Sequence, residues 1–280
     1  MRFTRIHVLQ SLLVLSSMPF TGCGSNPVSA PPASVSPNIT GNWQIGTQNT
    51  SSVPTKTVFN LVGALSMQGS QASAVFRAPS SIFSSVSCSS MQDIGIPFAG
   101  SIDASNLLTL TSAPFSGSTA TLQLQLPLTR SQASGSIQIT GDSCPLASTP
   151  VLGRFIPSVT GTYTGTLAPF PGQATTTTGG TATITLTQAS ANADGQFPVT
   201  ASLSFTSPTC TLPATPLTGA VSGAELSLNS APPTPTDSPS IRFNAGAFFA
   251  GATLSGSSLN ILSDTPGCLS GNFLGVLMSQ

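Results

Sequence analysis

The stretch TATLQLQLPL, residues 119–128, decides the fold class because apolar and polar residues alternate through it. Leu122, Leu124 and Leu126 fall on one side of an extended chain, and Gln123 and Gln125 fall on the other. This alternation is typical of an antiparallel β-strand with one buried face, since successive side chains of a strand point to opposite sides. The same pattern recurs in TATITLTQ at 181–188 and in VTASLSFTS at 199–207.

The chain contains two copies of one sequence pattern. ITGNWQIGT at 39–47 aligns with VTGTYTGTL at 159–167, a shift of 120 residues. ALSMQ, ending at residue 68, aligns with TLTQ, ending at residue 188, at the same shift. We therefore expect two β domains, residues 38–157 and 158–280, each of an ordinary domain size.

Short turn sequences separate the alternating runs. They are rich in Asp, Asn, Gly and Ser, the residues that favour hairpin turns. Clear examples are MQGSQ at 67–71, DASN at 103–106, NADGQ at 192–196 and SGAE at 222–225. No amphipathic helix pattern stands out after residue 38. About eight runs in each copy predict an all-β protein with two tandem repeats of an antiparallel β-barrel or β-sandwich domain.

The five cysteines divide into two pairs and one single residue. Each copy holds two, so the simplest pairing joins Cys88 to Cys144 and Cys210 to Cys268 and leaves Cys23 alone. Such bonds persist in an oxidising compartment. A metal site is not expected, because the chain has no CxxC pair and its only histidine, His7, lies in the first segment.

The first 22 residues have the three parts of a secretory signal peptide: basic residues, an apolar run, and small residues before a cleavage point. Phe-Thr-Gly-Cys at 20–23 resembles the lipobox of bacterial lipoproteins, in which the cysteine is acylated. The resemblance implies that Cys23 carries a lipid that anchors the protein in a bacterial cell envelope. Gly24 in place of Asp implies the outer membrane, by similarity to enteric lipoproteins. Residues 23–37 are rich in Pro and Ser and predict a tether between the lipid and the β domains.

The first copy opens with Gly41-Asn42-Trp43, which resembles the GxW motif of lipocalins, avidins and other calycin barrels. In that family the tryptophan closes one end of the barrel and a basic residue of the last strand packs over it. The resemblance implies a pair formed by Trp43 and Arg154. The second copy has Tyr163 and Asn272 at the matching positions, so both members differ together. A Greek-key sandwich stays the alternative architecture.

The composition excludes several classes of function. Only 5% of the residues are charged, and clustered Lys and Arg are lacking, so nucleic-acid binding is not expected. Without a histidine after the signal segment, a Ser-His-Asp or Cys-His apparatus cannot form. No glycine-rich phosphate loop and no other cofactor site is predicted.

Paired carboxylates are the remaining route to catalysis, because a glycosidase needs two acids a short distance apart. The candidates are Asp93, Asp103, Asp142, Asp194, Glu225, Asp237 and Asp264. Several stand beside Gly, Ser or Asn in predicted turns, where an Asp side chain binds its own backbone.

We therefore expect a cell-envelope lipoprotein with a non-enzymatic binding or structural role. Its partner would be the membrane through the lipid anchor, together with a small apolar ligand, a glycan or an envelope protein. The alternative is a carboxylate-dependent hydrolase acting on polysaccharide. The one Trp, the one Tyr and the fifteen Phe residues are expected in the core rather than on a sugar-binding platform.

Overall fold

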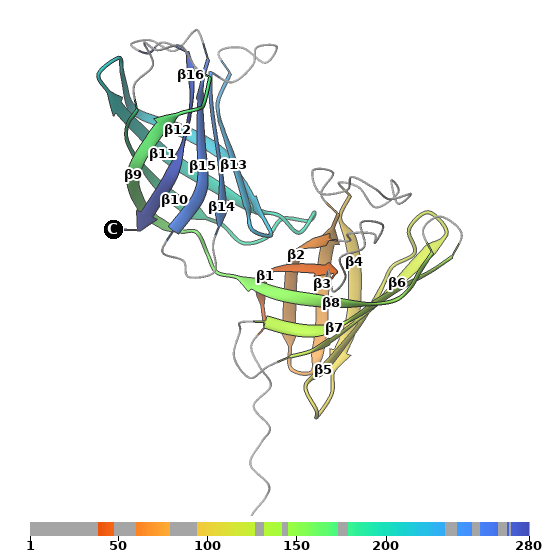
Figure 1. Ribbon diagram of the computed structural model, residues 1–280. Helices are drawn as coiled ribbons and strands as arrows, with labels where there is room; N and C mark the ends of the chain where they lie inside the picture. Colours follow the sequence, from red (N-terminus) through yellow and green to blue (C-terminus); the bar gives the residue numbers. More distant parts are fainter. Residues whose placement is uncertain are drawn as a thin grey trace, which may run out of the picture. The chain divides into compact units, whose positions relative to one another are not determined.

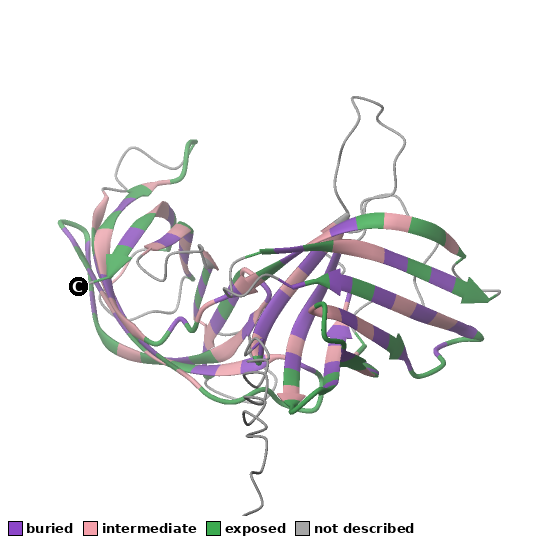
Figure 2. Cartoon of the chain, turned by 90° about the horizontal axis from the view of Figure 1, so that it is seen from below, coloured by how far each residue is buried: buried purple, intermediate pink, exposed green. Residues whose placement is uncertain are grey.

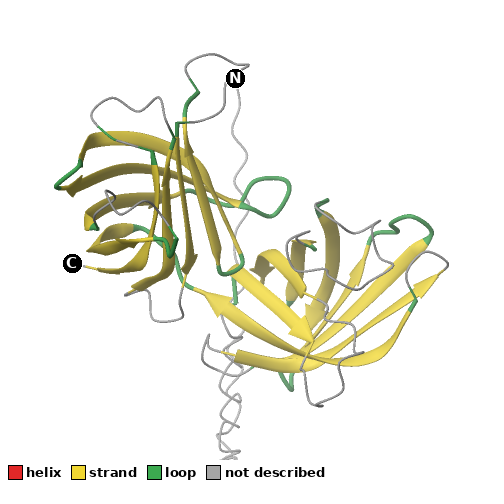
Figure 3. Ribbon diagram, turned by 45° about the horizontal axis from the view of Figure 1, so that its top comes forward, coloured by secondary structure: helices red, strands yellow, loops and turns green. Residues whose placement is uncertain are grey.

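The computed structural model describes residues 39–47, 60–78, 94–126, 132–141, 145–172, 179–232, 240–247, 253–262, 268 and 270–279. These residues form strands joined by turns, without a helix among them (Figure 3). Over the same residues, then, no helix exists that could cross a membrane.

The first eight strands close into an antiparallel barrel (Figure 1). They are β1 Gly41–Thr47, β2 Asn60–Gln68, β3 Gln71–Arg77, β4 Ile96–Ile102, β5 Leu107–Ser112, β6 Ser118–Gln125, β7 Gln132–Gly141 and β8 Leu146–Ile156. Each strand pairs with its sequence neighbours, and β1 also pairs with β8, which closes the ring.

The last eight strands form a second closed antiparallel barrel with the same order. They are β9 Gly161–Pro169, β10 Gly180–Gln188, β11 Phe197–Ser207, β12 Cys210–Ser222, β13 Glu225–Ser230, β14 Ile241–Ala247, β15 Thr253–Ile261 and β16 Gly271–Ser279. Pairing of β16 with β9 completes this ring. The predicted all-β fold with two tandem repeats is confirmed, and of the two predicted architectures the barrel is the one formed. Closure leaves no unpaired edge strand in either ring.

The alternation that predicted the strands sets the inside and outside of each barrel (Figure 2). In β6, Leu122 and Leu124 are buried, whereas Gln123 and Gln125 are exposed. An eight-stranded barrel has an interior just wide enough for side chains to fill. The inward-pointing residues of the first barrel therefore form one hydrophobic core.

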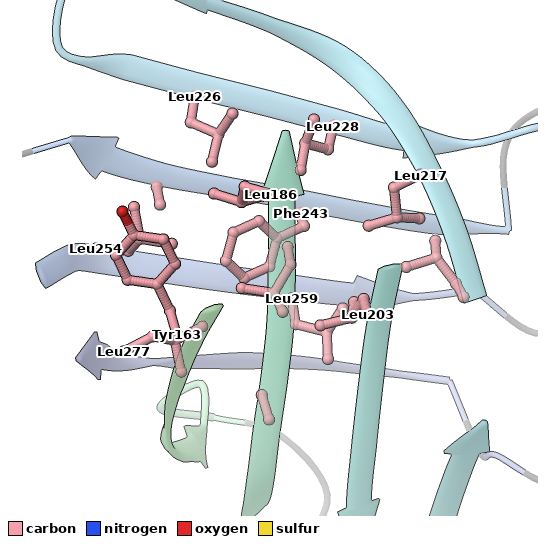
Figure 4. Close-up of a cluster of buried hydrophobic side chains, with 14 of the residues drawn as sticks. Tyr163, Leu186, Leu203, Leu217, Leu226, Leu228, Phe243, Leu254, Leu259 and Leu277 are labelled. Carbon is pink, nitrogen blue, oxygen red and sulfur yellow. The ribbon is translucent and has the colours of Figure 1, made fainter. Parts of the chain in front are cut away.

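Leucine is the commonest residue in the core of the second barrel, and the leucines come from facing strands (Figure 4). Leu186, Leu203 and Leu228 come from three different strands and are at most 1% exposed. Phe243 and Tyr163 fill the space between them. The described interior is thus largely hydrocarbon, with the Tyr163 phenol and the buried Ser257 hydroxyl as its polar groups of note.

Equivalent hydrogen bonds begin the first strand of each barrel. The Trp43 Nε1–H donates to the carbonyl of Ile39 over 2.7 Å, four residues back. The Tyr163 hydroxyl donates to the carbonyl of Val159 over 3.1 Å, also four residues back. Burial raises the pKa of the Tyr163 phenol, so the hydroxyl stays protonated and keeps donating. Two different aromatic side chains thus perform the same task in the two copies.

The register of the next strand differs by one residue from the sequence alignment. Trp43 lies opposite Gly63, and Tyr163 lies opposite Ile184, so the two second strands correspond at a shift of 121 residues. The sequence match of residue 68 with residue 188 is therefore one residue out. The extra residue lies between the first and second strands of the second copy.

Candidate binding surface

The second predicted disulfide is present. Cys210 and Cys268 are bonded, with 4.3 Å between their Cα atoms and a sequence separation of 58. The bond ties the first residue of β12 to the segment that precedes β16. Cys23, Cys88 and Cys144 lie outside the described residues, so the lipidation site and the first disulfide stay predictions.

The strand register puts Phe155 directly opposite Trp43, so the pair of Trp43 and Arg154 that the calycin resemblance implied stays a prediction. Trp43 points into the barrel and is 1% exposed, and the ring of Phe155 meets it edge-on at 5.9 Å between centroids. Arg154 lies directly opposite Gln44 and is exposed. Since neighbouring side chains of a strand point to opposite faces, Arg154 starts from the outer face of β8, whereas Trp43 points inward.

The matching pair of the second copy is separated. Tyr163 lies opposite Ser279 of β16, whereas Asn272 lies opposite Asn260 of β15 and is exposed. The aromatic residue belongs to the core, and Asn272 belongs to the outer surface.

Asp103 has a structural role in the turn between β4 and β5. Its Oδ1 accepts hydrogen bonds from the Ser105 hydroxyl at 2.6 Å, the Ser105 N–H at 2.8 Å and the Leu107 N–H at 3.0 Å. The hydroxyl of Ser105 and the amide of Leu107 hold the pKa of Asp103 below its ordinary value. A carboxylate satisfied by its own turn is a poor candidate for proton transfer.

The other described carboxylates lie in other turns. Asp194 belongs to the β10–β11 turn, where its N–H donates to the Asn192 side chain at 3.0 Å. Glu225 opens β13 opposite Ser222. Asp93, Asp142, Asp237 and Asp264 lie outside the described residues. Within the described residues, no group of three His, Cys, Asp or Glu side chains is placed to hold a metal ion.

An open groove of about 770 Å³ lies on the outer surface of the second barrel, over β12, β13 and β14. Its lining consists of Thr218, Ser227, Asn229, Ser230, Ala231, Pro232, Arg242 and Asn244. Ser230 fixes one end, since its hydroxyl accepts the Ile241 N–H at 3.1 Å.

Arg242 is the charged side chain among the described residues that line the groove. It is exposed, and it lies directly opposite Asn229 on one side and Asn260 on the other. It is also the only Lys, Arg or His between residues 158 and 280. A guanidinium offers five N–H donors, and each asparagine amide offers both donors and an acceptor. The described residues that line the groove include no carboxylate, so this arrangement suits binding of a polar or anionic group.

Sequence reasoning missed Arg242 and also Phe170. Arg242 and Asn244 alternate with Ile241 and Phe243, which marks them as outward-facing residues of a strand. That signal gives the face but not the neighbours across the sheet. Phe170 was expected in the core with the other phenylalanines, and it is instead 48% exposed, directly after β9.

Comparison of the chain with protein-family models, curated proteins and solved structures found no match. The class of the protein is therefore defined by its fold and surface: a tandem pair of closed eight-stranded antiparallel barrels with an apolar interior and a polar groove outside.

Proposed function

We propose that this protein is a lipoprotein of the bacterial cell envelope, attached to the outer membrane through Cys23, which binds a partner on its barrel surface without catalysing a reaction. The signal sequence and the lipobox resemblance support the anchor. The Cys210–Cys268 disulfide supports an oxidising compartment outside the cytoplasm.

The distribution of polar groups supports binding on the outer surface. The described inward-facing positions carry mostly aliphatic and aromatic side chains, whereas the groove over β12–β14 gathers hydroxyls, amides and the Arg242 guanidinium. A barrel of this size holds a ligand inside only where side chains leave room. Leucines from facing strands and Phe243 meet in the middle of the second barrel, which favours the outer surface over an internal pocket for a small apolar ligand (Figure 4).

A polysaccharide hydrolase is the less favoured function. It needs two carboxyl groups within about 5 to 9.5 Å, one of them a proton donor. Asp103, Asp194 and Glu225 occupy three different hairpins, and the carboxylate of Asp103 accepts hydrogen bonds from the backbone of its own turn. The described part of the chain thus gives this reaction no assembled acid pair.

Acylation of Cys23 tests the anchor. Cells expressing the full chain are labelled with radioactive palmitate and fractionated, with a high-salt wash of the membranes. We expect the wild-type chain to carry label and stay with the membranes, and Cys23→Ser to lose both properties. The matched control is Ser25→Ala, which changes the tether beside the cysteine and should keep the label. A wild-type chain without lipid would overturn the anchor.

A further inference from the structure

A row of directly paired residues starts in the groove and crosses five strands of the second barrel. Thr218 of β12 lies opposite Asn229, Asn229 opposite Arg242, Arg242 opposite Asn260, and Asn260 opposite Asn272. The N–H of Phe170 then donates to the carbonyl of Asn272 over 2.8 Å, which places Phe170 next in the row. We call these six residues the polar track: Thr218, Asn229, Arg242, Asn260, Asn272 and Phe170.

The polar track faces outward along its whole length. Its strand neighbours Leu228, Phe243 and Phe273 are buried in the core, so the track side chains must point away from it. Thr218, Arg242 and Asn272 are exposed, and Asn229 and Asn260 are half-buried. Figure 1 shows β13, β14, β15 and β16 side by side, as the pairing requires.

The track is long enough for a polymer. Neighbouring strands lie about 4.8 Å apart, so the four steps from Asn229 to Phe170 span roughly 19 Å measured around the outside of the closed barrel, and a ligand that contacts both residues must follow this curve. A single sugar or amino acid would use only a fraction of this length. The groove at the Thr218 end and the exposed aromatic ring at the other end give the track two distinct ends.

The chemistry of the track fits a carbohydrate chain. An asparagine amide can donate and accept at once, which matches the hydroxyls of a sugar. A half-exposed phenylalanine ring presents an apolar face, against which the C–H groups of a sugar ring can pack. Arg242 lies between Asn229 and Asn260, and Asn272 and the Phe170 ring follow, so several contacts can form along one chain.

The single guanidinium selects the charge of the ligand. Arg binds a carboxylate through two parallel N–H···O bonds, a geometry that a neutral hydroxyl cannot match. The track itself carries no acid that would repel an anion. We propose that the polar track binds a polysaccharide that carries carboxylate groups, such as a polymer of uronic acids, with Arg242 on a carboxylate and Phe170 against a sugar ring. This inference rests on the proposed surface-binding function and names its ligand class.

The test is affinity electrophoresis of the purified full chain in native gels that contain sodium alginate, a uronate polymer, or dextran, a neutral one. We expect alginate to retard the wild-type chain and dextran not to do so. A hydrogen bond to a charged group contributes enough that Arg242→Gln should raise the apparent Kd for alginate about tenfold or more. Phe170→Ala should also raise it, because the ring contact is lost.

The matched control is Arg154→Gln, which removes the same charge from an exposed strand position of the first barrel. It should bind alginate like the wild-type chain. Equal losses in the two arginine variants would show attraction by net charge alone and would overturn the track. Equal retardation by dextran, no retardation by alginate, or an unchanged Phe170→Ala variant would also overturn it. Retardation does not depend on acylation, so Cys23→Ser should bind alginate normally. The proposal of the lipid anchor and the proposal of the polar track can therefore be refuted independently.

Discussion

Removing the Cys210–Cys268 bond should destabilise the second barrel by a predictable amount. The bond closes a loop of 58 residues. On the chain-entropy description, cross-linking a loop of that length restricts the unfolded chain by about 4 kcal/mol at 25 °C. We therefore expect Cys210→Ala/Cys268→Ala to lower the free energy of unfolding of β9–β16 by about 4 kcal/mol. That change corresponds to about a thousandfold loss of amide protection, since 1.4 kcal/mol is a factor of ten.

Hydrogen exchange followed by mass spectrometry measures this loss separately in each barrel. Peptides from β9–β16 should exchange faster in the double variant, and peptides from β1–β8 should not, because both cysteines belong to the second barrel. The control is Thr211→Ala/Ser270→Ala, which alters exposed neighbours of the same two segments and should leave protection unchanged. A loss below tenfold in β9–β16, or an equal loss in β1–β8, would refute the reasoning.

Three further predictions concern the aromatic residues and a turn. Tyr163→Phe removes the donor to the Val159 carbonyl and should lower the free energy of unfolding in urea by about 1 to 2 kcal/mol; an unchanged value would show that the bond does not form. Trp43→Phe and Arg154→Ala should have additive effects in a double-mutant cycle, within about 0.5 kcal/mol, because their side chains lie on opposite faces of the sheet, and a larger coupling would contradict that placement. Carbon-13 NMR should give Asp103 a pKa below that of an ordinary Asp. Its contribution to folding stability is then complete above the ordinary pKa and disappears as the pH falls through the lowered pKa. A measured pKa at or above the ordinary value would contradict the hydrogen bonds of the turn.

Much of the fold follows from short-range patterns in the sequence. The alternation of Leu122 and Leu124 with Gln123 and Gln125 predicted a strand with one buried face, and β6 is such a strand. The turn sequences at 103–106 and 222–225 join β4 to β5 and β12 to β13 as expected. These features depend on residues close together in the chain, so the sequence alone carries them.

The candidate binding surface could not be predicted in the same way. The sequence marked Arg242 as an outward residue of a strand, but its neighbours Asn229 and Asn260 are 13 and 18 residues away and are set by strand pairing. The same limit applies to Arg154. The calycin resemblance implied a contact with Trp43, and only the structure shows that the register puts Gln44 opposite Arg154.

The sequence by itself determined the all-β class, the two copies and the partition of cysteines that includes the Cys210–Cys268 bond. Each rests on local alternation, on self-similarity or on counting. Only the tertiary structure decided that each copy closes into a barrel and that Thr218, Asn229, Arg242, Asn260 and Asn272 form one row. The physical reason is that a one-residue slip between strands moves every side chain to the other face. The register therefore comes from the packing of the whole barrel. The second strands of the two copies show this, because the sequence alignment matches them at a shift of 120 residues and the strand pairing at a shift of 121.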